Sequence, residues 1–395
     1  GHAVTGVDLD PRKIEAIQDR TSYIEDVSDT RLQTVTDSGS FAAARAMPGF
    51  FDIAIIAVPT PMKQSGEPDL SYVEAAGEMI SAVMSKGCTV VLESTTYPGT
   101  TEGVLGPVLA AGSGLTPSVD FHLGFSPERI DPGPSSPYTL ENTPKLVSAT
   151  TEEGLRVVRE FYDTIVETTV PVSTPATAEM TKLFENIQAN VSIALSNEVD
   201  SLCHDLGIDF YEMLDAAMTK GHSMARWTPG PGVGGHCLPV DPMYLAWLAR
   251  TKLGRPFKFA ELADEVNNGR PHYVVDRAAA MLNDRGLAVR NARILILGTA
   301  YKPNVGDVRE SPALPVVADL QARGALVTVA DPHVHEWELT PTIAAEAVGS
   351  DLENYDLVIL VTDHDAFDYT KIAERAPALL DCRNRFSPTD KLVRL

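Results

Sequence analysis

The stretch GPGVGGHCLPVDP, residues 230 to 242, places a cysteine behind four glycines and a histidine. A lone cysteine such as Cys237 is most often a small buried hydrophobe. A core position, however, does not need several neighbours without side chains, whereas glycines let a ligand approach the backbone closely. The pattern therefore predicts a substrate-binding loop that presents a thiol nucleophile. The glycines concerned are Gly230, Gly232, Gly234 and Gly235.

Polar residues upstream recur at offsets that place them on one face of a helix. Lys182 and Asn186 are four residues apart and could direct an ammonium and an amide at one developing oxyanion. The alternative is an ordinary solvated face, although asparagine is a mediocre helix former. The polar stripe comprises Glu179, Lys182, Asn186, Asn190 and Asn197, and the apolar stripe beside it comprises Leu183, Ile187, Val191 and Leu195.

Two aspartates are further candidates for chemistry. Asp241, four residues after the cysteine, is expected to orient water or a base, or to cap a helix from Tyr244 to Ala249. Asp8 follows a strand-like segment, His2 to Val7, where a dinucleotide site needs a carboxylate for the ribose hydroxyls. A strand-end aspartate is about as often a turn former or a helix cap.

The elements that must position these residues follow an alternating α/β pattern at both ends of the chain, which is typical of parallel sheets. A helix without proline or glycine is predicted from Ala178 to Leu206 between them. We expect three domains, 1–175, 176–285 and 286–395, of which the first and third are Rossmann-like and the second is helical. The predicted strands are His2 to Val7, Phe51 to Val58, Thr89 to Leu92, His122 to Phe125, Arg293 to Gly298, Leu326 to Asp331 and Tyr355 to Val361.

The third region contains a strand, a turn and a helix before Leu326, but nothing precedes the matching strand at His2. In a dinucleotide-binding domain this unit is the first strand, the glycine-rich turn and its helix, roughly 20 to 25 residues. We therefore expect the natural protein to carry this additional N-terminal unit. The alternative is a protein that starts here and binds no dinucleotide.

Composition excludes several classes of function. A net charge of -22 repels polyanions, which argues against nucleic acid as a partner. No apolar run approaches the roughly 20 residues of a membrane helix, so no membrane association is expected. The four cysteines are scattered, which predicts neither a metal site nor a disulfide framework and favours a reducing cytoplasm.

Four segments together resemble the UDP-glucose/GDP-mannose dehydrogenase family: GPGVGGHCLPVDPMYL, SPERIDPG, TKLFENIQANVSIALSNEVD and LGTAYKPNVGDVRESPA. The resemblance implies an NAD-dependent, four-electron oxidation of a UDP-sugar at C6. The aldehyde would add to Cys237, and the thiohemiacetal would be oxidised to a thioester that water hydrolyses. It also implies a homodimer or higher oligomer built on the central helices.

The same resemblance assigns roles to individual residues. Lys182 and Asn186 would stabilise oxyanions, Asp241 and Thr95 would position water and assist proton transfer, and Glu128 would contact substrate or act as a base. Cofactor contacts would come from Asp8, Thr60, Thr95 and Arg309. Substrate contacts would come from Glu128, Arg129, Lys182, Gly230, Gly232, Gly234, His236 and Lys302.

The substrate prediction depends on the cysteine loop, which reads GGHCLPVD where UDP-glucose enzymes have a loop like GGSCFPKD. His236 and Val240 therefore favour the N-acetylhexosamine branch, with UDP-N-acetylglucosamine first, UDP-N-acetylmannosamine second and UDP-glucose as a further alternative. The rivals are a β-hydroxyacid dehydrogenase, which transfers two electrons, and a non-catalytic nucleotide-sugar binder.

Overall fold

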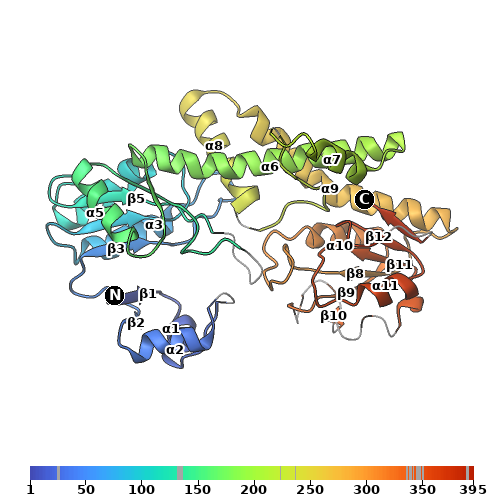
Figure 1. Cartoon of the computed structure of the whole chain (residues 1–395), viewed down its shortest axis with the longest axis horizontal. Helices are drawn as coiled ribbons and strands as arrows, with labels where there is room; N and C mark the ends of the chain where they lie inside the picture. The colour runs from blue at the N-terminus through green and yellow to red at the C-terminus, as the bar shows by residue number, and fades with distance from the viewer. Residues whose placement is uncertain are drawn as a thin grey trace. The chain divides into compact units, whose positions relative to one another are not determined.

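The computed structural model describes residues 1–24, 27–130, 137–222, 224–235, 237–334, 337, 340, 342–343, 348, 351–387 and 391–395. The chain divides into two compact units, Gly1–Glu185 and Asn186–Leu395. The predicted α/β class with Rossmann-like parallel sheets and a long central helix is confirmed (Figure 1). None of the described helices is both long and apolar enough to cross a membrane.

The first unit contains a five-stranded sheet in the order β3-β4-β5-β6-β7. Neighbouring strands are parallel except β5 and β6, which are antiparallel. The bounds are β3 Ile53–Ile56, β4 Thr89–Leu92, β5 His122–Phe125, β6 Lys145–Ala149 and β7 Thr169–Pro171. Two of these strands, β4 and β5, have the predicted bounds, because short apolar runs ending in polar turns define them clearly.

Helices cover this sheet on two faces. One core joins β3, β4 and β5 to α3 (Ser71–Ser81), η1 (Thr101–Leu105) and α4 (Gly106–Ser113). A smaller core joins β4 and β6 to α5 (Glu152–Tyr162). The carboxyl ends of β3, β4 and β5 are therefore left at one edge, where loops can carry functional side chains.

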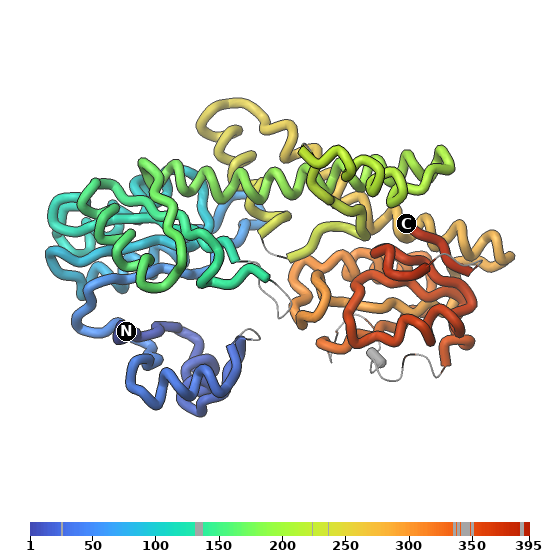
Figure 2. Tube along the Cα trace, viewed as in Figure 1, coloured from blue at the N-terminus to red at the C-terminus, as the bar shows by residue number. Residues whose placement is uncertain are grey.

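The start of the chain forms a separate pair of parallel strands, β1 (Val4–Val7) and β2 (Phe41–Ala44), with α1 (Pro11–Gln18) and α2 (Asp29–Asp37) between them (Figure 2). Among the described residues, no strand hydrogen-bonds this pair to the five-stranded sheet.

The long helix α6 runs from Pro175 to Leu206 and ends at Gly207, whose φ of +68° is the left-handed conformation that terminates helices. Its first eleven residues belong to the first unit and the remainder to the second. The second unit continues with the helices α7 (Phe210–Met218), α8 (Cys237–Leu253) and α9 (Lys258–Asp284).

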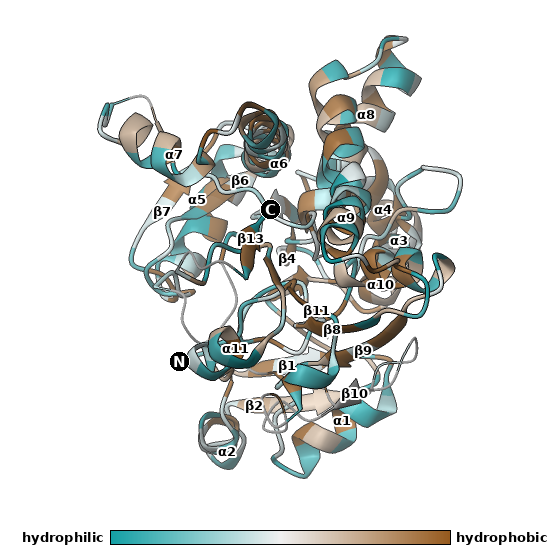
Figure 3. Ribbon diagram, turned by 90° about the vertical axis from the view of Figure 1, so that its right-hand side faces the viewer, coloured by the Kyte–Doolittle hydropathy of each residue, from teal (hydrophilic) through white to brown (hydrophobic). Residues whose placement is uncertain are grey.

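The second unit also contains a six-stranded parallel sheet in the order β10-β9-β8-β11-β12-β13, which is the doubly wound order of dinucleotide-binding folds. Its strands are strongly apolar (Figure 3), and α9 and α10 (Ala313–Ala322) pack on one face while η3 (Leu352–Asn354) and α11 (Tyr369–Arg375) pack on the other. The strand bounds are β8 Arg293–Leu297, β9 Leu326–Ala330, β10 Thr342–Ile343, β11 Leu357–Leu360, β12 Leu379–Asp381 and β13 Leu392–Arg394.

Three local expectations need correction. Asp241 does not cap a helix, because α8 already begins at Cys237 and Asp241 lies inside it. Leu195, assigned to one apolar stripe with Leu183 and Ile187, is 61% exposed although those two are buried, so the stripe does not share one environment. The solvated-face alternative is wrong for Asn190 and Asn197, which are buried together with Glu179.

Candidate active site

Two predicted cofactor residues meet at the carboxyl edge of the first unit's sheet. Thr60 follows β3, and its hydroxyl donates a hydrogen bond of 2.8 Å to the carbonyl oxygen of Thr95, which follows β4. Thr60 is buried and Thr95 half-buried. The pair therefore fixes the two turns against each other where parallel strands end.

Asp8 directly follows β1, and its carboxylate forms an ion pair with Lys13. One carboxylate oxygen accepts a hydrogen bond of 2.7 Å from Lys13 Nζ, and the other accepts one of 2.9 Å from the backbone N–H of Asp10. Partial burial alone raises the pKa of Asp8, but the bond from Lys13 outweighs it, so the net shift is downward. Asp8 is thus held ionised, as an acceptor for hydroxyl groups must be.

Glu128 and Arg129, which follow β5, belong to a charged cluster in the first unit. Arg129 forms a two-pronged ion pair with Glu185, at 2.6 and 3.2 Å, and donates a bond of 2.7 Å to the carbonyl of Pro144. Glu128 lies 3.2 Å from the buried Lys145, a residue that the sequence analysis did not select. No feature of the sequence around Lys145 pointed to this contact.

Lys182 is half-buried on α6, three residues after the fully buried Glu179. The Glu179 carboxylate accepts hydrogen bonds from the backbone N–H of Gly99, at 2.6 Å, and from the N–H and hydroxyl of Thr101, at 2.9 and 2.6 Å. Burial raises the pKa of Glu179, and these donors oppose the rise. Glu179 thereby fixes the segment of α6 that carries Lys182 to the turn after β4.

The cysteine loop of the second unit is held by side-chain amides. Asn197 accepts a bond of 2.9 Å from the N–H of Gly230 and donates one of 2.9 Å to Asn267 Oδ1. Asn190 donates a bond of 3.0 Å to the carbonyl of Leu238. The asparagines of the polar stripe therefore position the loop, which explains why they face inward.

Arg270 on α9 completes this support. Its guanidinium donates to the carbonyls of Gly230 and Asn197, both at 3.0 Å, and to Ser201 at 2.8 Å. It also forms a buried ion pair of 2.7 Å with Asp200. Sequence reasoning missed Arg270 and Asn267, because both lie 40 to 77 residues from their partners and in a helix with no distinctive motif.

Cys237 is the first residue of α8 and is exposed, whereas Cys88, Cys203 and Cys382 are buried. Its thiol therefore lies at the N-terminal end of a helix, where a ligand can reach it. One turn further along α8, the buried Asp241 accepts a hydrogen bond of 2.5 Å from Asn186 Nδ2 on α6. The structure therefore brings two predicted catalytic residues, Asn186 and Asp241, into contact in the unit that carries the thiol.

The glycines before Cys237 were predicted to let a ligand approach the backbone. In the structure they also let another segment of the chain pack closely against it. A Cβ on Gly234 would lie 2.6 Å from Tyr301 Cβ and 2.9 Å from the carbonyl oxygen of Glu310. Gly235 has a φ of +81° and donates its N–H to the carbonyl of Arg309 at 3.0 Å. The approaching segment is thus the chain's own residues 301 to 312, which include the half-buried Lys302. His236 lies outside the described residues.

At the corresponding edge of the second sheet, Asp331 follows β9 and accepts several hydrogen bonds. Its Oδ2 accepts from the backbone N–H groups of Thr299 and Ala300, at 2.7 and 3.0 Å, and lies 3.0 Å from Nε2 of the buried His364. Burial alone raises the pKa of Asp331, but His364 and these donors lower it far below its usual value.

The chain also matches known proteins. Models of the successive domains of one enzyme family cover it in order: an NAD binding domain at residues 1–166, a central domain at 176–269 and a UDP binding domain at 295–388. The chain belongs to the UDP-glucose/GDP-mannose dehydrogenase family. It is accordingly an NAD-dependent nucleotide-sugar dehydrogenase.

Two relatives in this family illustrate the range of substrates. A UDP-N-acetyl-D-mannosamine dehydrogenase of Salmonella typhimurium is 31% identical over 92% of the chain and 88% of the relative. An NDP-N-acetyl-D-galactosaminuronic acid dehydrogenase of Ralstonia nicotianae is 31% identical over 97% and 90%. The solved structure of a UDP-D-ManNAc dehydrogenase from Pyrococcus horikoshii matches with a TM-score of 0.89 and 30% identity, over 100% of this chain and 93% of that one.

The described residues of the first unit fit NAD at two places. Asp8 provides an ionised acceptor after β1, and the joined turns of Thr60 and Thr95 lie where parallel strands end, as a dinucleotide site requires. The glycine-rich turn that would hold the pyrophosphate is not among these residues. When NAD is bound, Asp8 would accept ribose hydroxyls and the two threonines would contact the cofactor.

Proposed function

We propose that the enzyme oxidises a UDP-N-acetylhexosamine at C6 to the uronic acid, in two oxidations, as a precursor for polysaccharide synthesis. The observation that carries the proposal is the exposed thiol of Cys237 at the start of α8, with the Asn186–Asp241 pair one turn away along that helix. A two-electron oxidation of an alcohol has no need for a nucleophilic thiol, whereas the second oxidation of an aldehyde does.

Cys237 is proposed to form a covalent intermediate with the substrate. The thiolate of Cys237 adds to the C6 aldehyde, which forms a carbon–sulfur bond and an oxyanion. Loss of the C6 hydride from this adduct, to NAD as the acceptor that would serve both oxidations, re-forms the C=O bond and leaves a thioester on Cys237. Water then attacks the thioester carbonyl, the carbon–sulfur bond breaks, and the carboxylate leaves while the thiolate is regenerated.

Lys182 and Asn186 are proposed to stabilise the oxyanions, since they lie one turn apart on α6. An amide has two N–H groups, and Asn186 uses one for Asp241. We assign the second to the oxyanion. Asp241 and Thr95 are proposed to position water and assist proton transfer, and Glu128 to contact substrate or accept a proton.

The remaining predicted contacts also stay proposals. Arg309 is assigned to the cofactor, although its guanidinium is paired with Asp307 at 2.6 Å in the structure. The sugar nucleotide is assigned to Glu128, Arg129, Lys182, Gly230, Gly232, Gly234, His236 and Lys302.

The most specific part of the proposal is the configuration of the sugar at C2. Sequence reasoning from the cysteine loop places UDP-N-acetylglucosamine first. Relatives named as UDP-N-acetyl-D-mannosamine dehydrogenases instead favour UDP-N-acetylmannosamine. Both are UDP-N-acetylhexosamines that differ at C2, so we propose this class and treat the two epimers as its candidates.

The test is a panel of UDP-N-acetylglucosamine, UDP-N-acetylmannosamine and UDP-glucose with NAD, with NADH counted per sugar consumed and the product identified by mass. Two NADH and an acid support the proposal, and one NADH with an aldehyde contradicts it. Cys237→Ser should abolish acid formation, because an alkoxide is a far poorer leaving group than a thiolate. Cys203→Ser, at a buried cysteine, serves as the matched control and should still form acid.

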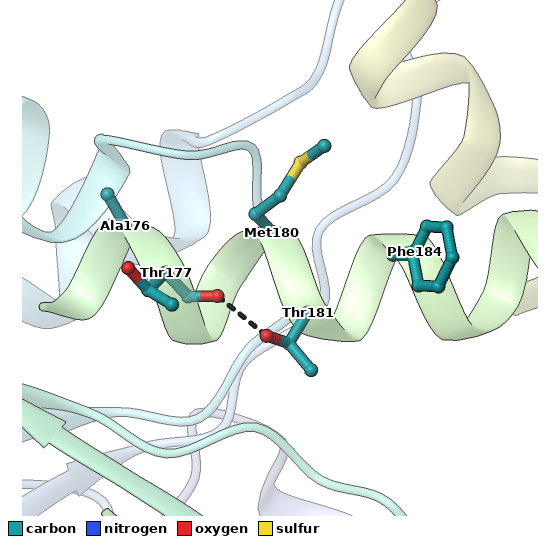
Figure 4. Close-up of a pocket in the computed structure, with 5 residues that line it drawn as sticks. All are labelled: Ala176, Thr177, Met180, Thr181 and Phe184. Carbon is teal, nitrogen blue, oxygen red and sulfur yellow. Dashed lines mark hydrogen bonds between the residues drawn. The ribbon is translucent and has the colours of Figure 1, made fainter. Parts of the chain in front are cut away.

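We further propose that the enzyme is a homodimer or larger oligomer that uses α6. A second apolar stripe on this helix is exposed, and at 100° per residue its members lie within about 80° of one another. Figure 4 shows its first part, where Met180 and Phe184 line a pocket with Ala176, Thr177 and Thr181. The exposed stripe comprises Met180, Phe184, Leu195, Leu202 and Leu206.

The oligomer proposal predicts that Leu195→Glu lowers the mass measured by light scattering, whereas Gln33→Glu, at an exposed position of α2 outside the stripe, does not. An unchanged mass for the Leu195 variant would contradict this interface. The cytoplasm is proposed as the compartment, because an exposed catalytic thiol needs reducing conditions.

A further inference from the structure

A buried lysine lies behind the proposed substrate-contacting carboxylate of the first unit. Lys145 has a side chain that is only 3% exposed, and its Nζ lies 3.1 Å from Glu93 Oε1 and 3.2 Å from Glu128 Oε2. It also lies 5.4 Å from the ring centroid of Tyr162. A buried ammonium is costly unless it is paired, so these two carboxylates are what allows Lys145 to be buried here.

The antiparallel strand β6 brings this lysine to the functional edge. In the register of β5 and β6, Phe125 lies opposite Ser148. Continuing that register by three residues places Glu128 opposite Lys145, the first residue of β6. In an entirely parallel sheet the start of this strand would lie at the other edge, far from the loops that follow β4 and β5.

The two carboxylates differ in what surrounds them. Glu93 is 17% exposed and accepts a hydrogen bond of 2.5 Å from the hydroxyl of Tyr162. Glu128 is 43% exposed, and its Oε1 accepts the backbone N–H groups of Arg129 and Ile130 at 2.6 and 2.7 Å. Glu128 is therefore held by Lys145 and two backbone N–H groups but remains partly exposed, whereas most of the Glu93 side chain is buried.

We propose that Lys145 is a positioning residue for the dehydrogenase reaction: it holds the Glu128 carboxylate charged and in one orientation, while Glu93 limits its effect by sharing the ammonium. This inference rests on the proposed role of Glu128 in the oxidation of the sugar. Lys145 itself, buried behind Glu128, does not touch the reacting atoms.

The charges facing Lys145 determine the sign of the expected effects. They are Glu93 after β4, Glu128 after β5 and the neutral hydroxyl of Tyr162 on α5, whose pKa burial raises and Glu93 raises further. Burial alone raises the pKa of Glu128, but Lys145 and the backbone donors bring it below its usual value. Removing the lysine charge should therefore raise the pKa of Glu128, and removing the Glu93 charge should lower it.

The experiment compares Lys145→Met and Glu93→Gln with the wild-type enzyme. Lys145→Met should move the acid limb of the kcat–pH profile upward by about 1 to 2 pH units, the usual effect of losing one adjacent opposite charge. Glu93→Gln, which keeps an oxygen for Tyr162 and Lys145, should move the limb downward. Lys145→Arg should restore most of the wild-type profile.

A direct readout accompanies activity. The carboxyl carbon of Glu128, assigned in ¹³C spectra by its loss in Glu128→Gln, is titrated in each variant and should shift in the same two directions. Lys86→Met removes an exposed lysine that pairs with Asp120 at 2.9 Å and should shift neither readout.

Opposite shifts for the two variants support the inference, because a purely structural role would not move the limb in both directions. An unshifted Glu128 titration in Glu93→Gln overturns it, even when Lys145→Met fails to fold. The proposed function is judged separately on wild-type enzyme, by the count of two NADH per sugar.

Discussion

Asn197 offers the sharpest test of how the cysteine loop is held. The substitution Asn197→Leu keeps the size and shape of the side chain but removes its donor and its acceptor. The N–H of Gly230 then loses its 2.9 Å partner, and Asn267 Oδ1 loses the N–H that binds it at 2.9 Å. All three residues are buried, so water cannot replace the lost bonds without opening the structure.

The magnitude follows from these two groups. Each orphaned buried group costs about 1 to 3 kcal/mol, and burying the leucine side chain returns about 2 kcal/mol. The free energy of unfolding of the second unit should therefore fall by about 2 kcal/mol, within a range of about 0 to 4 kcal/mol. Replacing both amides, in Asn197→Leu with Asn267→Leu, should cost less than the sum of the single changes, because fewer partners remain orphaned.

Tryptophan fluorescence during urea unfolding is a suitable assay, because all three tryptophans, Trp227, Trp247 and Trp337, belong to the second unit. Gln188→Leu on the exposed side of α6 is the matched control and should change stability by less than about 0.5 kcal/mol. If Asn197→Leu were as stable as this control, the amide network would not be what fixes the loop.

Three further predictions concern the thiol, the ammonium and the second sheet. A thiol reagent should modify one cysteine per native chain, Cys237, and four after denaturation, and mass spectrometry of the labelled peptide checks this. Lys182→Ala should lower kcat by about 10² to 10³ if it stabilises an oxyanion, and a change confined to the melting temperature would contradict that role. Because the pKa of Asp331 is lowered in the folded state, its charge stabilises the second unit above the usual aspartate pKa, near 3.9, and this stabilisation is lost as pH falls below it. Asp331→Asn should therefore be less stable at neutral pH but lose less stability on acidification, which urea unfolding between pH 5 and 3 would measure.

The fold was largely predictable because buried strands are short apolar runs bounded by polar turns. The strands at Thr89–Leu92 and His122–Phe125 show this, as does the long helix without internal proline or glycine. The start of α8 was harder to predict, because glycines precede it and Pro239 follows two residues after Cys237. Proline is tolerated in the first turn of a helix, so the pattern did not exclude one.

The site was predictable only where neighbours in sequence are neighbours in space. Helical spacing found the stripe of Asn190 and Asn197, but it could not tell which side of α6 is covered, so it did not separate the exposed Leu195 from the buried Leu183. Lys145 was missed because its position depends on the antiparallel direction of β6, which local residues do not encode. Arg270 was missed because its partners are remote along the chain.

The carboxylate of Asp331 has a consequence for how the second sheet can be used. It already occupies the backbone donors at Thr299 and Ala300, the turn at which a doubly wound domain would receive a pyrophosphate. A dinucleotide offered to this turn would meet negative charge instead of vacant N–H groups. Two Rossmann-like domains of one chain are thereby made chemically unlike, and a large excess of NAD should leave the KM for the sugar nucleotide unchanged.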